Sequence, residues 1–144
     1  MDVEIRQERI SAAEYINFLN RTDLGSQYPK ERFEERIKKL TSNVPISLIA
    51  RNQERKIIGV CFAITDFAYW LFLTDLGVDR CYTGKGIGKR LVAAAMEAAG
   101  GTDDIIMYTC ANENAIPFYE KIGMVPARDM MEYNHVQWTN FTVK

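Results

Sequence analysis

Two early segments of the chain carry apolar residues at helical spacing. Ser11 can cap the first, which runs through Leu19, because a serine side chain accepts a hydrogen bond from the first turn. Pro29 suits the first turn of the second, where Phe33 and Ile37 fall on one face. The pattern predicts helices over 11–19 and 29–40.

The later part of the chain contains several runs rich in β-branched or aromatic residues and one run rich in alanine. The long apolar stretch 57–78 contains Asp66 and Asp75, each of which would cost about 2.5–3.5 kcal/mol near a bilayer centre. We therefore interpret it as a hairpin of two buried strands and not as a membrane helix. The expected strands are 3–8, 46–51, 57–65, 69–78 and 104–110, the last buried on both faces, and the later helices are 86–99 and 114–122. With a mostly extended tail after 123, the predicted order is β-α-α-β-β-β-α-β-α-β, an α/β fold with a mixed sheet.

Composition narrows the class of protein. The 144 residues are 47% hydrophobic and 26% charged, with a formal net charge of −1, which fits one globular domain spanning 1–144. Such a balance gives no general attraction to nucleic acid or to an anionic membrane. The N-terminal residues lack the apolar core of a signal peptide, so we expect a cytoplasmic protein.

The three cysteines and the single histidine argue against two further classes. Cys61, Cys81 and Cys110 are widely spaced and odd in number, which favours a reducing compartment over a disulfide framework. His135 stands alone in the C-terminal segment, and we expect neither a metal site nor a catalytic histidine.

Three glycines in five residues, Gly84, Gly86 and Gly88, precede the alanine-rich helix. They can form a tight turn, or a cradle in which backbone N–H groups and the helix dipole hold an anion such as pyrophosphate. The spacing fits neither the G-x-x-x-x-G-K-[ST] loop nor the G-x-G-x-x-G fingerprint, which it misses by one residue. On the glycines alone, both readings stay open.

The surrounding sequence resembles the GNAT superfamily of N-acetyltransferases. The stretch Thr83–Gly88 is similar to the family's coenzyme A motif, R/Q-x-x-G-x-G/A. A second motif, N-x-x-A-x-x-F-Y-x-x-x-G-F, is matched by Asn112, Ala115, Phe118, Tyr119, Gly123 and Met124. Together the two motifs place the resemblance over about Ile57–Met124.

The resemblance implies acetyl transfer from acetyl-CoA to a primary amine on a sheet splayed between its fourth and fifth strands. An isolated glycine in a strand signals a bulge or a close approach, and in the family a bulge at Gly77 would help to open the cleft. The coenzyme-binding residues it implies are Leu76, Gly77 and Val78 for the pantetheine arm, Thr83, Gly84, Lys85, Gly86, Ile87, Gly88 and Lys89 for the pyrophosphate, and Asn112 and Tyr119. Thr83 stands where the family has Arg or Gln, so we expect weakened coenzyme binding.

Tyr119 is the catalytic residue that the resemblance implies. A phenol there can protonate the departing thiolate, whereas the alternative is a packing aromatic. Asn112 would contact the coenzyme, cap the following helix, or both. The general base stays open between Asp66 and Asp75, each of which can instead end a strand or bind its own backbone.

The acceptor side should involve residues 25–32 and the first two helices. Tyr28 and Phe33 can line an apolar pocket or simply pack. The expected partner is a small-molecule or peptide amine, and a homodimer is compatible with the sequence. Two alternatives remain: a non-catalytic acyl-CoA-binding module, and an acetyltransferase acting on a protein N-terminus or lysine.

Overall fold

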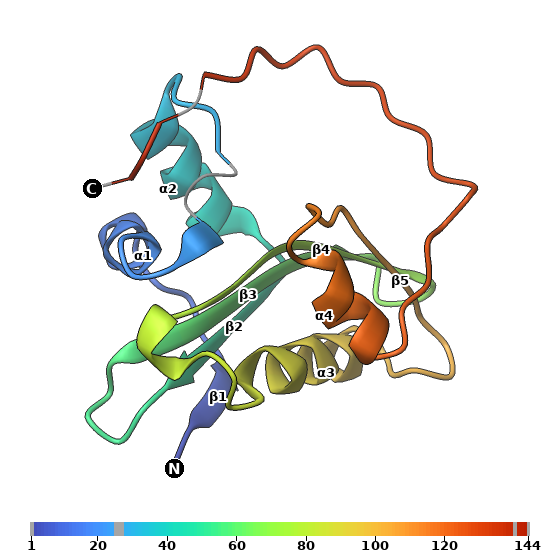
Figure 1. Ribbon diagram of the computed structural model, residues 1–144, viewed down its shortest axis with the longest axis horizontal. Helices are drawn as coiled ribbons and strands as arrows, with labels where there is room; N and C mark the ends of the chain where they lie inside the picture. Colours follow the sequence, from blue (N-terminus) through green and yellow to red (C-terminus); the bar gives the residue numbers. More distant parts are fainter. Residues whose placement is uncertain (1, 25–27, 140, 144) are drawn as a thin grey trace.

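The computed structural model describes residues 2–24, 28–139 and 141–143. Figure 1 shows the elements in chain order. They are β1 (Glu4–Gln7), α1 (Ala12–Leu19), α2 (Phe33–Asn43), β2 (Ile46–Arg51), β3 (Ile57–Thr65), β4 (Trp70–Val78), a short 3₁₀ helix (Arg80–Tyr82), α3 (Ile87–Ala99), β5 (Ile106–Thr109) and α4 (Ile116–Lys121). The predicted hairpin 57–78 is confirmed as β3 and β4, and no helix among the described residues is long and apolar enough to cross a membrane.

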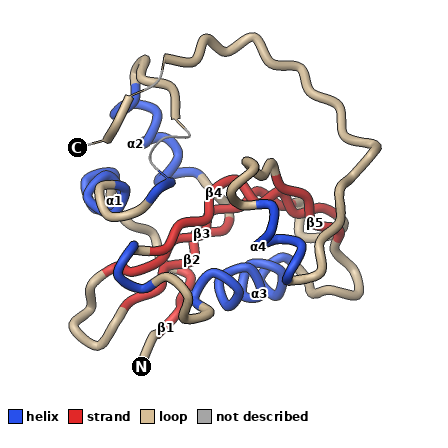
Figure 2. Tube along the Cα trace, in the orientation of Figure 1, coloured by secondary structure: helices blue, strands red, loops and turns tan. Residues whose placement is uncertain are grey.

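The described strands form one mixed sheet in the order β1-β2-β3-β4-β5. Its pairs are antiparallel except β4 with β5, which are parallel. Helices α1 and α2 cover one face, and α3 with α4 lies on the other (Figures 1 and 2). Apolar side chains fill both interfaces: one cluster joins the sheet to α3 and a second joins it to α1 and α2. The predicted α/β class with a mixed sheet is confirmed.

Local sequence explains how the first two helices begin. The Ser11 side chain accepts the Glu14 N–H at 3.0 Å, while the Glu14 carboxylate accepts the Ser11 N–H, which closes a capping box. The predicted start of the second helix at Pro29 is wrong. Arg32 has a left-handed backbone with φ of 54°, which no helical residue adopts, so α2 begins at Phe33.

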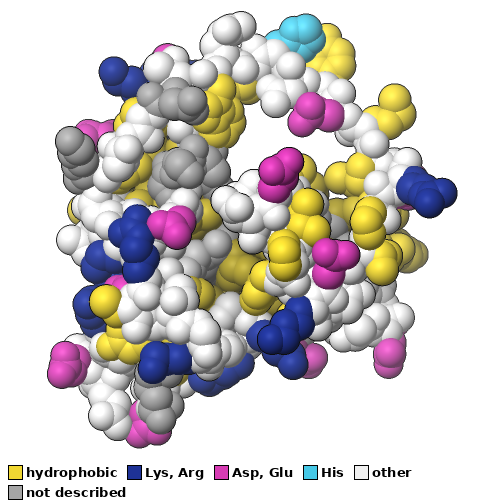
Figure 3. Space-filling view, in the orientation of Figure 1, with side chains coloured by type: hydrophobic (Ala, Val, Ile, Leu, Met, Phe, Trp, Pro, Cys, Tyr) yellow, Lys and Arg dark blue, Asp and Glu magenta, His cyan; other side chains and the backbone are white. Residues whose placement is uncertain are grey.

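The end of the chain differs from the expected final strand. Within 124–139 and 141–143 the described tail forms no strand, and Met131 and Tyr133 are 96% and 93% exposed. Figure 1 shows this tail arcing away from the sheet, and Figure 3 shows an open gap between part of the tail and the body. The described sheet ends at β5, with no tail segment paired to it. Because β5 therefore remains an edge strand, Ile106 is 53% exposed and the expected burial of that strand on both faces is wrong.

One extra residue interrupts the pairing of β3 with β4. Phe62 lies opposite Asp75 and Ala63 lies opposite Leu73, so Thr74 is the unpaired residue of a β-bulge. The bulge predicted at Gly77 is wrong, since Gly77 pairs in register with Val60. Gly77 instead allows a close approach: a Cβ there would meet the Leu24 side chain at 3.0 Å.

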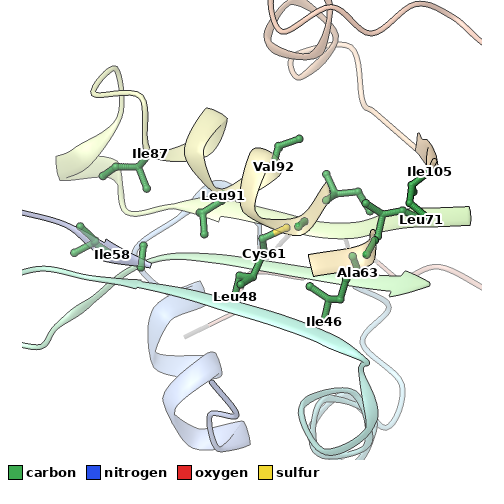
Figure 4. Close-up of a cluster of buried hydrophobic side chains, with 14 residues drawn as sticks. Ile46, Leu48, Ile58, Cys61, Ala63, Leu71, Ile87, Leu91, Val92 and Ile105 are labelled. Carbon is green, nitrogen blue, oxygen red and sulfur yellow. The ribbon is translucent and has the colours of Figure 1, made fainter. Parts of the chain in front are cut away.

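Cys61 lies in the first apolar cluster, between Leu48 and Leu91 (Figure 4). Burial, with a smaller effect of the Asp75 charge, raises the pKa of its thiol from 9.0 to about 12. Because the unfolded thiol ionises first, its contribution to stability is complete below pH 9 and is lost as pH rises from 9 toward 12.

We expect the free energy of unfolding to fall by about 1.4 kcal/mol per pH unit above pH 9 through this thiol. Urea unfolding between pH 7 and 10 measures the slope. In Cys61→Ala the slope should be less steep by about 1.4 kcal/mol per pH unit, which corresponds to one proton. Cys81→Ala, which removes an exposed thiol, should retain the wild-type slope. Equal slopes in all three proteins would contradict the assignment.

Candidate active site

The sheet opens where β5 stops following β4. Their parallel pairing covers Trp70–Leu73 and ends at Thr109, whose hydroxyl donates to the Leu73 carbonyl at 2.9 Å. Beyond this point the second half of β4 faces a cavity of about 420 Å³. Its other walls come from residues 22–24, residues 109–112 and the start of α4. The predicted splay between the fourth and fifth strands is therefore present.

Backbone groups of β4 line this opening. Asp79 N–H donates to the Ile58 carbonyl at 2.9 Å, and bonded pairs alternate along an antiparallel ladder. By this alternation Gly77 bonds toward β3, whereas Leu76 and Val78 direct their N–H and C=O groups to the opposite side. Of the three predicted pantetheine residues, Leu76 and Val78 can thus add hydrogen bonds to an extended ligand, and Gly77 supplies space.

The glycine loop leads directly into α3. Gly84 and Gly86 have φ of 76° and 81°, and a Cβ on either would meet no atom within 4 Å. Gly86 is the N-cap of α3, so the first-turn N–H groups of the helix have no partner within it and point toward the loop. Lys85 and Lys89 are exposed beside it. This arrangement suits a pyrophosphate.

The other loop residues have structural contacts. The Ile87 side chain is 1% exposed in the core, and a Cβ on Gly88 would lie 3.2 Å from the Phe118 ring, so Gly88 permits α3 and α4 to pack. The Thr83 hydroxyl donates to the Arg80 carbonyl at 3.2 Å and fastens the start of the loop. Thr83 also lines the cavity.

Arg80 is a cavity residue that the sequence analysis missed. Its guanidinium donates to the Asp23 carboxylate at 2.9 Å and to the carbonyls of Asn20 and Thr22 at 3.1 and 2.9 Å. It thereby holds the segment after α1 against the segment after β4, forming one mouth of the cavity. No local motif marks this role, because its partners lie 57 to 60 positions earlier.

Tyr119 and Asn112 both line the same cavity. Burial raises the pKa of the Tyr119 phenol, a hydrogen bond with Thr109 partly offsets this, and the phenol therefore stays protonated at neutral pH. The Asn112 side chain accepts the Ala115 N–H at 2.9 Å, which orders the turn into α4. Asn112 thus orients the start of α4, as predicted, but the N-cap of this helix is Ala115; Pro117 falls in the first turn of α4 as expected.

The two candidate bases lie in different surroundings. Asp66 accepts three backbone N–H groups in the β3–β4 turn, which lower the pKa of its carboxyl, and it is a turn residue away from the cavity. Asp75 is 4% exposed and lines the cavity. Without the extra residue Thr74, Asp75 would share the face of Leu71 and Leu73. The bulge turns its carboxylate toward α1 and α2.

There Asp75 ends a chain of hydroxyl groups. The Tyr28 phenol donates to its carboxylate, and the Tyr15 and Tyr28 oxygens are 2.6 Å apart. Because Tyr28 has a single proton and gives it to Asp75, Tyr15 is the donor to Tyr28. Burial, the neighbouring Tyr15 and Asp75 raise the pKa of Tyr28, so this phenol remains a donor.

A second cavity, of about 550 Å³, meets the first at Thr74 and Asp75. Tyr28 and Phe33 line it and also pack against each other, with ring centroids 6.0 Å apart, so both expected roles hold. Of the predicted acceptor segment, residues 25–27 lie outside the described residues. Among the residues that are described, no group of three or more His, Cys, Asp or Glu side chains could hold a metal ion.

Comparison with known proteins identifies similar sequences and folds. Residues 13–124 match the acetyltransferase (GNAT) family. The chloroplastic GCN5-related N-acetyltransferase 2 of Arabidopsis thaliana is 33% identical over 73 residues, which cover 51% of this chain and 28% of the plant protein. The match thus spans little more than a quarter of that relative.

Solved structures share the fold at low identity. A GNAT-family acetyltransferase of Streptococcus pneumoniae superposes with a TM-score of 0.69 at 17% identity, covering 94% of this chain and all 100% of that chain. The aminoglycoside N-acetyltransferase AAC(6')-Iy, solved in complex with CoA, gives a TM-score of 0.67 at 16% identity, with 92% and 94% covered. It has also been solved with a bisubstrate analogue that joins CoA to an acetylneamine.

Proposed function

Because the chain belongs to the GNAT acetyltransferase family, we propose that it transfers the acetyl group of acetyl-CoA to a primary amine. The observation that carries this proposal is the opening beside β4, which is lined by Tyr119 of α4 and by Thr83, the residue that leads into the glycine loop. In this proposal the extended pantetheine arm of the coenzyme lies between α4 and the backbone N–H and C=O groups of Leu76 and Val78. Its pyrophosphate lies at the N-terminus of α3. AAC(6')-Iy, which has the same fold, was solved in complex with CoA, which supports coenzyme A as the ligand.

In the proposed reaction the amine nitrogen attacks the thioester carbonyl, forming a C–N bond as the C–S bond breaks. Asp75 attracts the acceptor ammonium and accepts its first proton, which frees the nitrogen lone pair for attack. The second proton leaves the nitrogen for solvent as the amide forms. Tyr119 donates its phenolic proton to the departing thiolate and recovers a proton from solvent. The loop glycines and the backbone of Leu76 and Val78 hold the thioester in place, which supplies part of the rate by positioning.

Two other functions remain testable alternatives. A non-catalytic acyl-CoA-binding module would use the same opening without Asp75 and Tyr119 acting on protons. An acetyltransferase for a protein N-terminus or lysine would need room at the mouth of the 550 Å³ cavity. We also propose a cytoplasmic location, which the three free cysteines support. A homodimer stays a proposal.

Acetyl-CoA should raise the melting temperature, whereas NAD and ATP should not. At one hundred times its dissociation constant a ligand adds about 2.7 kcal/mol, roughly 5–10 °C for a chain of this length. Thermal unfolding with each ligand at millimolar concentration measures the effect. No shift with acetyl-CoA would contradict the proposed function.

Gly86→Val should abolish that shift, because the side chain fills the open space of the loop. The strain of a β-branched residue at this φ is about 1–2 kcal/mol, which the fold should survive. Gly101→Val is a matched control, since Gly101 also has a positive φ, of 97°, with nothing within 4 Å, but lies beyond α3. It should retain the full shift.

A further inference from the structure

From the second cavity we propose that the acceptor is an amine with one positive charge on an apolar body, and that polycations are rejected. This inference rests on the proposed function and specifies its substrate class. It follows from where the cavity carries charge and where it does not.

The walls of the 550 Å³ cavity are largely apolar. Aromatic and aliphatic side chains form most of the lining, namely Tyr28, Pro29, Phe33, Ile37, Leu40, Val44, Pro45 and Ile64. Its volume suits a small molecule. Apolar walls bind an apolar body and offer a second charged group few hydrogen-bond partners, since Asn43 and Thr74 are the uncharged polar residues of the described lining besides Tyr28.

Charge occurs at two places in this lining. Among the described lining residues, Asp75 and Arg36 are the charged ones. Asp75 is 4% exposed and shared with the coenzyme cavity, so it lies at the inner end, where an acceptor nitrogen would meet the thioester. Arg36 is exposed, which places it at the outer end.

This distribution distinguishes monoamines from polyamines. A single ammonium group is attracted to the inner carboxylate while its carbon body contacts the walls. A second ammonium further along the same molecule would lie among apolar side chains or beside the Arg36 guanidinium, and either position is unfavourable. The cavity therefore selects by charge number as well as by shape.

The test compares two acceptors with the same six-carbon chain, using the wild-type protein. Hexylamine and 1,6-diaminohexane differ by one terminal amine, and release of free CoA thiol from acetyl-CoA measures kcat/KM for each. We expect hexylamine to be favoured by about a hundredfold or more. Equal or better use of 1,6-diaminohexane, or of spermidine, would overturn the inference while leaving acetyl transfer established. Transfer to neither these amines nor a lysine peptide would overturn the proposed function as well.

Reversing the charge of Arg36 tests whether this residue causes the preference for hexylamine over the diamine. Arg36→Glu places a carboxylate at the outer end, and the preference for hexylamine over the diamine should fall by about tenfold. Lys38→Glu makes the same charge change on an exposed residue of α2 that does not line the cavity, and should leave the preference unchanged. An equal effect of both variants would show a general field effect and overturn the role of Arg36. An unchanged preference in Arg36→Glu would do the same.

Discussion

Replacing Tyr119 by phenylalanine should lower turnover of a responsive amine by about 10²–10⁴, the usual contribution of one general acid. The ring would still fill its place against Phe118, 5.0 Å away between centroids, so fold and acetyl-CoA affinity should be unchanged. The raised pKa of the phenol keeps its proton available at neutral pH, and the substitution removes the hydroxyl group with its hydrogen bond to Thr109 while leaving the ring. Steady-state kinetics, with the acetyl-CoA melting shift measured separately, give both quantities.

Tyr69→Phe is the matched control, because it removes a phenol that is 67% exposed and away from both cavities. It should retain wild-type turnover. A Tyr119→Phe variant with unchanged turnover would remove Tyr119 from the mechanism and leave the coenzyme site standing. A loss below about tenfold would show that water can protonate the thiolate.

Asp75→Asn should lower kcat/KM for the amine by about 10²–10³, within the range for loss of a general base. The amide has nearly the same shape, and its oxygen can still accept from the Tyr28 phenol. What it lacks is the charge that attracts the ammonium group and the ability to take its proton. The acetyl-CoA melting shift should persist, which separates this loss from a failure to fold.

Asp66→Asn makes the same chemical change in the turn before β4. Its backbone hydrogen bonds affect the hairpin, so a small loss of stability with unchanged turnover is expected. If Asp66→Asn lowered turnover and Asp75→Asn did not, the assignment of the base would be reversed.

Sequence patterns predicted the elements whose periodicity is local. The boundaries of β2 and β3 agree with prediction, and those of α3 differ by one residue at its start, because each is set by its own run of apolar residues. The predicted start of α2 was wrong, because Arg32 has a left-handed backbone conformation that arginine rarely adopts. The prediction of a final strand was wrong, because the apolar residues of the tail do not by themselves bring it beside another strand with which to pair.

The site was predictable where a contiguous motif describes it. Thr83 of the glycine motif and Tyr119 of the second motif both line the opening. Asp75 could not be chosen over Asp66 from sequence, since its orientation depends on the bulge at Thr74 and its partner Tyr28 lies 47 positions away. Arg80 was missed for the same reason: its contacts are long-range.

Thr74 and Asp75 form a partition common to both cavities. Any ligand that moves or neutralises this partition alters the surface offered to the other ligand. Thermodynamic linkage requires the effect to be mutual: the factor by which acetyl-CoA changes amine affinity is the factor by which the amine changes acetyl-CoA affinity. If acetyl-CoA and the amine bind in these two cavities, the single inserted residue in β4 makes their binding equilibria interdependent, because it brings one carboxylate to both.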